Sequence, residues 1–226
     1  MKQRQRDTRC HMFKVKGIII DLDGTLVDSR DAYKEAFKKA LEAFGVTSFD
    51  PKIALEVPKK LEQGLPIADL VPVRDIKKFL NTYLETYYSI TEIKSKPLPG
   101  VYVTLEKLSE KAKLALLTMR HVPKDKVLSE LEKFNLAKYF QCIVTALDTS
   151  TPKPSPEPVL KCACRLGVKA CECLVAGDSI SDIRAGKLAG AKTVAFLSGI
   201  FSMEELKREN PDLILENINA LPAFVV

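Results

Sequence analysis

The stretch Gly17-Ile18-Ile19-Ile20-Asp21-Leu22-Asp23-Gly24-Thr25 places two acidic residues directly after an apolar run of strand length. A short apolar run of this kind is typical of a strand that is buried on both faces of a parallel sheet. Two carboxylates at the exit of a buried strand are costly to ionise together unless a cation lies between them. The alternative is a turn whose aspartates cap a helix. Gly24 fits both interpretations, because glycine permits a sharp turn and the close approach of a ligand.

Similar apolar runs recur along the chain and alternate with segments of helical periodicity. The predicted strands cover residues 15–20, 113–118, 142–145, 173–177, 193–197 and, more weakly, 213–215. The predicted helices between them cover residues 100–111, 123–134, 156–166 and 181–189. This alternation predicts an α/β fold, a Rossmann-like doubly wound parallel sheet with helices on both faces. In such folds ligands bind beyond the carboxyl ends of the strands.

One segment interrupts the alternation. Residues 28–96 contain helical patterns over 31–44, about 58–70 and 74–90, but no convincing strand. We therefore expect an inserted helical cap at 28–96, with the core formed by residues 12–27 and 97–226. Residues 1–11 are polar and basic, so we expect them to be a disordered extension, and Met12 could be the natural start.

Composition limits the class of protein. The chain has 226 residues, of which 46% are hydrophobic and 28% charged, a globular balance that excludes collagen-like and disordered chains. No apolar run reaches the roughly 18 residues that a membrane span needs, so we expect a cytoplasmic protein with no membrane partner. The net charge of +6 is mild, and acidic residues are spread throughout, so no nucleic-acid partner is expected. Whether the chain is a monomer or a dimer stays open.

Four cysteines, Cys162, Cys164, Cys171 and Cys173, lie within twelve residues and raise the hypothesis of a zinc site. Their pairs are spaced CxC, and residues two apart on a helix point in different directions, which disfavours one shared metal. We interpret them instead as small buried hydrophobic residues with at most one disulfide.

A second acidic set follows the predicted strand at 173–177. Asp178 comes directly after this strand and Asp182 lies near the start of the next helix, so both face the same edge of the sheet as Asp21. Carboxylates gathered in one cleft would repel each other, and a hard divalent cation such as Mg²⁺ resolves that repulsion. A phosphate ester approaching such a cleft needs further positive charge and hydrogen-bond donors. Thr118, at the end of a strand, and Lys153, in a proline-rich loop, are the candidates.

Four motifs in this order resemble those of the haloacid dehalogenase superfamily of phosphohydrolases, and the resemblance extends from about Lys14 to the end. The motifs are DLDGTLVDS at residues 21–29, LLT at 116–118, KPSPEP at 153–158 and GDSISDI at 177–183. The tail, with GIF at 199–201 and EEL at 204–206, resembles the phosphoglycolate-phosphatase-like branch, whose members carry a helical cap.

The resemblance implies a role for each acid. Asp21 would be the nucleophile that forms an aspartyl-phosphate. Asp23 would protonate the leaving oxygen and later deprotonate a water molecule. Asp21, the backbone carbonyl of Asp23 and Asp178 would hold Mg²⁺, with Asp182 in or near this set. Dehalogenating members lack the second acid, so Asp23 indicates a phosphatase.

The resemblance also implies the substrate contacts. Thr118 and Lys153 would bind the phosphoryl group, and Gly24 and Thr25 would lie beside the substrate. Relatives often have Asn after the threonine of the second motif, whereas this chain has Met119 followed by Arg120. Either the backbone N–H of Met119 suffices, or Arg120 supplies an anion contact.

The expected function is Mg²⁺-dependent hydrolysis of a small phosphomonoester, phosphoglycolate being the default. The alternatives are a β-phosphoglucomutase-type phosphotransferase and a catalytically idle phosphate-binding or interaction relative. Both histidines, His11 and His121, lie outside the cap, which counts against the mutase. The cap carries 12 basic and 11 acidic residues, so its charge selects no substrate. The cap positions to test first are Lys59, Lys60, Gly64 and Arg74, while the tyrosines at 33, 83, 87 and 88 fit packing better than substrate stacking.

Overall fold

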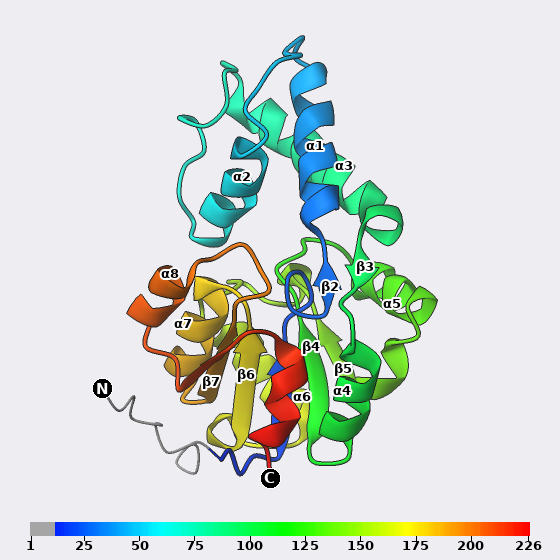
Figure 1. Ribbon diagram of the computed structural model, residues 1–226, viewed down its shortest axis with the longest axis vertical. Helices are drawn as coiled ribbons and strands as arrows, with labels where there is room; N and C mark the ends of the chain where they lie inside the picture. The colour runs from blue at the N-terminus through cyan, green and yellow to red at the C-terminus, as the bar shows by residue number, and fades with distance from the viewer. Residues whose placement is uncertain (1–11) are drawn as a thin grey trace, which may run out of the picture.

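A six-stranded parallel sheet forms the centre of the protein in the computed structural model, which describes residues 12–226 (Figure 1). The expected extension at residues 1–11 lies outside the described residues. The strand order is β5-β4-β1-β6-β7-β8. The strands are β1 (Gly17–Ile20), β4 (Lys113–Leu117), β5 (Cys142–Val144), β6 (Cys173–Gly177), β7 (Lys192–Phe196) and β8 (Leu213–Leu215). The predicted fold class and all six predicted strands of the core are confirmed, with small shifts of their ends.

Helices cover both faces of the sheet, because successive side chains of a buried strand point to opposite sides. On β1, Ile18 and Ile20 join the apolar cluster under α4 (Val101–Ser109) and α5 (Lys124–Lys133). Ile19 joins the cluster on the other face, under α6 (Glu157–Leu166) and next to α7 (Ile180–Leu188). The helix α8 (Met203–Arg208) follows β7. Short 3₁₀ turns lie at Ala137–Tyr139, Ala146–Asp148, Ala170–Glu172 and Ile218–Ala223.

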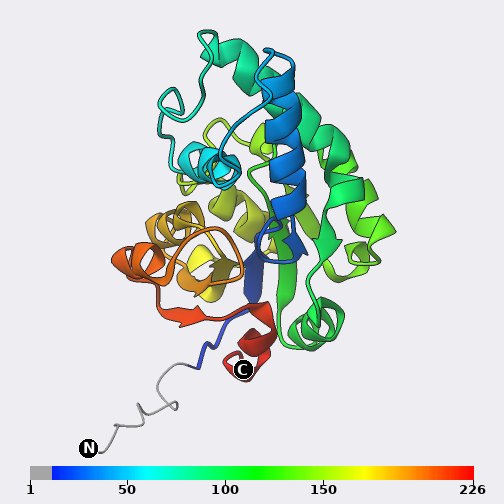
Figure 2. The same cartoon turned by 45° about the horizontal axis from the view of Figure 1, so that its top comes forward.

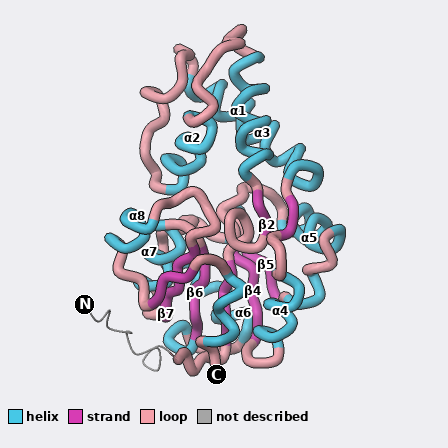
Figure 3. Tube along the Cα trace, viewed as in Figure 1, coloured by secondary structure: helices cyan, strands magenta, loops and turns pink. Residues whose placement is uncertain are grey.

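Three helices stand above the carboxyl ends of the strands, and we call them the helical cap: α1 (Arg30–Glu42), α2 (Ile53–Glu62) and α3 (Ile76–Lys94). They share an apolar cluster that includes Phe37, Phe79 and Tyr83. Two short antiparallel strands, β2 (Val27–Asp28) and β3 (Lys96–Pro97), form the passage between cap and sheet. Figure 3 shows the cap as helices and loops alone, beyond the magenta strands of the core. Glu62 of α2 contacts Ser181 of α7, and Lys59 of α2 contacts Glu205 of α8, so the cap helix lies over this side of the core (Figure 2).

The second cap helix differs from its prediction. The sequence pattern placed it at about 58–70 with Pro58 at its start, whereas α2 begins at Ile53 and contains Pro58. Ala54, Val57 and Pro58 are buried together in the cap, so packing outweighs the local tendency of proline to begin a helix. The helix ends before Gly64, whose φ of +67° is a left-handed conformation that suits glycine after a helix end.

The five described cysteines are all free. Cys162 and Cys173 are buried in the apolar cluster beneath α6, while Cys164 and Cys171 are exposed. The only potential metal cluster found among residues 12–226 is made of aspartates. The interpretation as buried hydrophobic residues is therefore confirmed for Cys162 and Cys173 and wrong for Cys164 and Cys171, which lie on the surface. Across the described part of the chain, no helix combines the length and the apolar character of a membrane span, and a cytoplasmic location stays a prediction.

Candidate active site

The register of the sheet brings the first two acids together. β1 and β6 are neighbouring parallel strands in which Ile20 lies opposite Ala176. The chain leaves the strands at the same level, and the backbone N–H of Asp21 donates to the carbonyl of Ala176 at 3.0 Å. Asp21 and Asp178 therefore meet at the carboxyl edge of the sheet, where they are 8% and 3% exposed.

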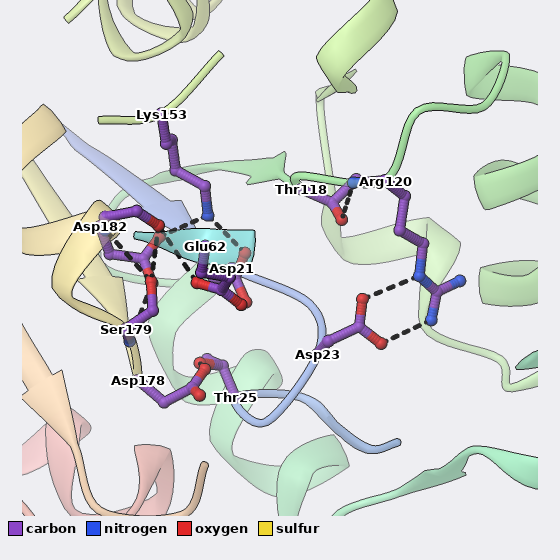
Figure 4. Close-up of polar contacts among 11 residues, drawn as sticks. Asp21, Asp23, Thr25, Glu62, Thr118, Arg120, Lys153, Asp178, Ser179 and Asp182 are labelled. Atoms are coloured by element: carbon purple, nitrogen blue, oxygen red, sulfur yellow. Dashed lines mark hydrogen bonds and ion pairs between the residues drawn. The ribbon is translucent and has the colours of Figure 1, made fainter. Parts of the chain in front are cut away.

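Asp182 and Lys153 complete a buried charged cluster (Figure 4). Asp182 lies in the first turn of α7, where its carboxylate accepts hydrogen bonds from the backbone and hydroxyl of Ser179. The Nζ atom of Lys153 lies 2.7 Å from Oδ1 of Asp21 and 2.5 Å from Oδ1 of Asp182. One oxygen from each of Asp21, Asp178 and Asp182 lies within 4.8 Å of the others. Asp21 thus shares one small volume with Asp178 and Asp182, which lie far from it in sequence.

The charges in this cluster do not balance. Burial, then repulsion from Asp21, raises the pKa of Asp178 well above its usual value. Burial also raises the pKa of Asp21, although Lys153 counteracts part of the effect. Burial opposes the charge of Lys153, but attraction to Asp182 and Asp21 leaves its pKa above the usual value. With three carboxylates and one lysine, the cluster has an excess of two negative charges when all are ionised.

This donor set fits a divalent cation. Hard cations such as Mg²⁺ prefer carboxylate oxygens, and a 2+ charge would offset the excess of the cluster. Asp21, Asp178 and Asp182 are the side chains that could hold it. The side chain of Asp23 points away from them toward Arg120, so only its backbone carbonyl remains for the predicted contact with the metal (Figure 4).

Two glycines allow the Asp178 carboxylate to occupy its position. A Cβ atom on Gly24, whose φ is +82°, would lie 2.4 Å from Oδ2 of Asp178. A Cβ atom on Gly199 would lie only 1.7 Å from the same oxygen. No site role was predicted for Gly199 from the sequence. The motif GIF at 199–201, which resembles the phosphatase branch, was the one feature that could have pointed to it. The hydroxyl of Thr25 donates to Oδ1 of Asp178 at 2.7 Å, so this side chain orients the acid.

Substrate contacts by Gly24 and Thr25 stay predictions. The N–H of Gly24 donates to the carbonyl of Val27 at 2.8 Å, and that of Thr25 donates to Leu22 at 3.3 Å. These bonds hold the sharp turn between β1 and β2. The turn thereby places both Asp21 and Asp23 at the cleft.

Asp23 forms a separate buried network. Its carboxylate accepts hydrogen bonds from Nε and Nη2 of Arg120 at 2.8 and 2.7 Å, and from the hydroxyl of Ser29. Arg120 also donates two hydrogen bonds to Glu130, one of them from Nη2 to Oε1 at 3.2 Å. Its side chain is buried, with 4% of the residue exposed. Burial favours the neutral acid, but attraction to Arg120 outweighs it and lowers the pKa of Asp23. The guanidinium of Arg120, a predicted substrate contact, thus forms ion pairs with two carboxylates of the protein.

The second motif lies at the end of β4. The hydroxyl of Thr118 accepts a hydrogen bond from the backbone N–H of Arg120 at 3.2 Å, and Thr118 is buried. Met119 and His121 follow, and all of these residues line a cavity of about 300 Å³ between core and cap. The cavity also reaches Asp21 and Asp23. Phosphoryl binding by Thr118 and Lys153 stays a prediction.

The cap contributes an acid that the sequence analysis missed. Glu62, the last residue of α2, accepts a hydrogen bond from the hydroxyl of Ser181 at 3.2 Å and lines the cavity. Burial raises its pKa to about 7, with Lys153 opposing and Asp182 supporting the rise. No sequence signal identified it, because a glutamate near a helix end is usually solvated.

The four cap positions chosen from sequence do not line this cavity. Lys59 pairs with Glu205 of α8 at 2.8 Å, and Lys60 pairs with Asp69 within the cap. Gly64 and Arg74 are exposed. The tyrosines at 33, 83, 87 and 88 serve both interpretations, since they belong to the apolar cluster of the cap and also line the cavity.

Comparison with known proteins assigns the family. Residues 18–196 match the family described as haloacid dehalogenase-like hydrolase. A phosphoglycolate phosphatase of Shigella boydii is 31% identical over 234 residues, with 93% of this chain and 92% of that protein covered. The pyrophosphatase PpaX of Anoxybacillus flavithermus is 31% identical over 213 residues, covering 92% and 95%. A haloacid dehalogenase-like family hydrolase structure from Streptococcus pneumoniae superposes with a TM-score of 0.80 at 21% identity, covering 93% of this chain and 98% of that one.

The fold, the motifs and these relatives together define a phosphohydrolase. The chain belongs to the haloacid dehalogenase-like hydrolase family.

Proposed function

We propose that this enzyme is a Mg²⁺-dependent phosphatase that hydrolyses a small phosphomonoester through an aspartyl-phosphate on Asp21. The observation that carries the proposal is the convergence of Asp21, Asp178 and Asp182 within 4.8 Å, with Lys153 on two of them. A phosphate-binding module would need no buried nucleophile of this kind. When bound, Mg²⁺ would offset the charge of the acids and of the substrate phosphate.

The reaction has two steps. In the first, an oxygen of Asp21 attacks phosphorus, the bond from phosphorus to the ester oxygen breaks, and Asp23 gives its proton to the departing oxygen. In the second, Asp23 takes a proton from water, the water oxygen attacks phosphorus, and the bond to Asp21 breaks. The sum is one ester and one water converted to one alcohol and one phosphate. Lys153 offsets the negative charge on Asp21 and on the transferring group.

Asp23 must carry a proton for the first step. In the described arrangement its carboxylate is held by Arg120 at 2.7 and 2.8 Å, which favours the ionised form. This state is therefore the one that suits Asp23 as the base of the second step. For the first step, Asp23 must exchange its contact with Arg120 for the ester oxygen of a bound substrate.

The relatives suggest which substrates to test. One is named a phosphoglycolate phosphatase and another a pyrophosphatase. Phosphoglycolate, the default from the sequence, is the first ester to test. A β-phosphoglucomutase-type transfer would be recognised by a requirement for a bisphosphate activator and by little release of phosphate.

The test measures phosphate release from p-nitrophenyl phosphate with Mg²⁺ and with EDTA. We expect activity only with the metal, and none for Asp21→Asn at a melting temperature no lower than that of the wild type. Asp31→Asn is the matched control, since it removes an exposed carboxylate from the cap and should keep full activity. Acid-quenched samples should show covalently bound phosphate in the wild type and none in Asp21→Asn, and hydrolysis by Asp21→Asn at the wild-type rate would refute the covalent mechanism.

A further inference from the structure

The cavity between core and cap has two different sides. Its core side carries Asp21, Asp23 and Thr118, where the phosphoryl group would be transferred. Its cap side is mainly carbon, and the side chains that form most of it are Tyr33, Leu61, Leu80, Tyr83, Leu84 and Tyr87. The volume of about 300 Å³ is at the lower end for sites of small organic ligands. The group that leaves with the ester oxygen would lie against this apolar side.

The cavity offers no free cation to a second negative charge on the substrate. Of its described lining residues, Arg120 is the one with a permanent positive charge, and its guanidinium is already paired with Asp23 and Glu130. His121 is exposed to solvent, where pairing of charges is weak. Asp23 and Glu62 also line the cavity and would repel an anionic leaving group.

One buried tyrosine hydroxyl lacks a partner. Tyr83 is 1% exposed, and within residues 12–226 its hydroxyl has no hydrogen-bond partner. The hydroxyl of Tyr87, by contrast, lies beside the Asp23 carboxylate and helps to lower the pKa of that acid. Both residues line the cavity. A buried hydroxyl without a partner is unfavourable, and an acceptor atom of a ligand would relieve it. The ring of Tyr87 stacks on Tyr33 with centroids 4.7 Å apart, which fixes its position.

We propose that the preferred substrate is a phosphomonoester of an uncharged, largely apolar alcohol, with a flat group against the cap tyrosines and an acceptor atom facing Tyr83. This inference rests on the proposed phosphatase function and names the substrate class of the same site. An apolar leaving group gains from removal of its surface from water. A carboxylate or a second phosphate in that place would lose its hydration without gaining a partner.

The first experiment compares kcat/KM for benzyl phosphate, phosphoglycolate and pyrophosphate with the intact enzyme and Mg²⁺. Benzyl phosphate has an alkyl ester bond like phosphoglycolate, so leaving-group activation does not bias the comparison of these two esters. Pyrophosphate is an anhydride with a better leaving group, and it tests whether a second phosphate is accepted. We expect benzyl phosphate to be favoured on the order of tenfold or more, about the worth of burying one or two methylene groups. Equal or better hydrolysis of phosphoglycolate, or a lower KM for pyrophosphate than for benzyl phosphate, would overturn the substrate class while supporting the phosphatase. Absence of hydrolysis for every ester would overturn both proposals.

The second experiment introduces the missing cation. Leu84 is half-buried, so Leu84→Lys can place its ammonium at the cavity while its stem packs on the cap. We expect the preference to move toward phosphoglycolate on the order of tenfold. Leu160→Lys, on an exposed residue of α6 away from the cavity, is the matched control. An unchanged preference in a folded Leu84→Lys enzyme would contradict the assignment of this wall to the leaving group.

The third experiment tests the hydroxyl of Tyr83. Tyr83→Phe should raise KM for at least one of the ortho, meta and para methoxybenzyl phosphates on the order of threefold to tenfold. KM for benzyl phosphate, which lacks the acceptor, should stay within about twofold. Tyr102→Phe, on an exposed residue of α4, is the control. If no isomer distinguishes Tyr83→Phe from the wild type, the hydroxyl of Tyr83 does not contact the substrate.

Discussion

Replacing Gly199 with alanine tests the acidic cluster without removing any of its charges. The added Cβ would lie 1.7 Å from Oδ2 of Asp178, whereas ordinary contact begins at 3.4 Å. The carboxylate must therefore move by about 1.7 Å, the difference between the two distances. The backbone itself accepts alanine, because Gly199 does not have a left-handed φ.

A shift of this size should affect both the metal and the rate. Loss of a ligand's support weakens metal binding by about 10- to 100-fold, and a misplacement of about 1 Å can lower a rate by about 100-fold. We expect Gly199→Ala to raise the Mg²⁺ concentration for half-maximal activity by about 10- to 100-fold. Isothermal titration calorimetry with Mg²⁺ in the absence of substrate measures the same change directly.

The control for Gly199→Ala is Gly45→Ala in the cap. Gly45 has a φ of +74° and no atom within 4 Å of an added Cβ, so alanine there strains the backbone without touching the site. We expect a small loss of stability, about 1 kcal/mol, and unchanged Mg²⁺ affinity. Wild-type metal affinity and kcat in a folded Gly199→Ala protein would refute the assignment of Asp178 to the metal.

Three further predictions concern the buried charges. The pKa of Asp178 is higher in the folded protein than in the unfolded chain, so ionisation of this acid destabilises the folded state as pH rises above the usual carboxyl range. In EDTA, the melting temperature of Asp178→Asn should therefore exceed that of the wild type by more at pH 8 than at pH 5. A difference that is the same at both pH values would contradict this. Lys153→Met in EDTA leaves Asp21 buried without its cation and should lower stability by about 3 kcal/mol, seen as a melting temperature about 6–12 °C lower; an unchanged melting curve would show that the pair contributes nothing. Arg120→Ala frees Asp23 from its partner, so kcat should fall about 10- to 100-fold with KM within about twofold; a rise in KM at constant kcat would instead place Arg120 on the substrate.

The strands and the acids at their ends could be predicted from local sequence. The apolar run 17–20 is wholly buried at the centre of the sheet, and such a run has few alternatives to a central strand. The carboxyl ends of two neighbouring parallel strands lie at one edge of the sheet. Asp21 and Asp178, which follow β1 and β6, therefore meet there, whatever the other side chains of the strands are. For these two acids, the position directly after a buried strand was sufficient to predict that they lie together.

The second cap helix and the role of Arg120 could not be predicted in the same way. Local preference made Pro58 a helix start, but its burial beside Val57 places it inside α2. Arg120 follows a phosphate-binding motif and so suggested an anion contact. Its actual partners, Asp23 and Glu130, are 97 and 10 residues away along the chain. Such contacts depend on where helices pack, which periodicity does not specify.

The sequence by itself determined the order of strands and helices, the insertion of helices after the first strand, and the chemistry of the acids and lysine at the sheet edge. These follow from apolar runs, turn residues and charged residues that act over a few positions of chain. Only the tertiary structure decided that Glu62 and the cap tyrosines face those acids, that Gly24 and Gly199 make room for Asp178, and that Arg120 is taken by protein carboxylates. The reason is physical: close packing fixes which distant side chains share a cavity, and that choice depends on shapes and volumes across the whole molecule.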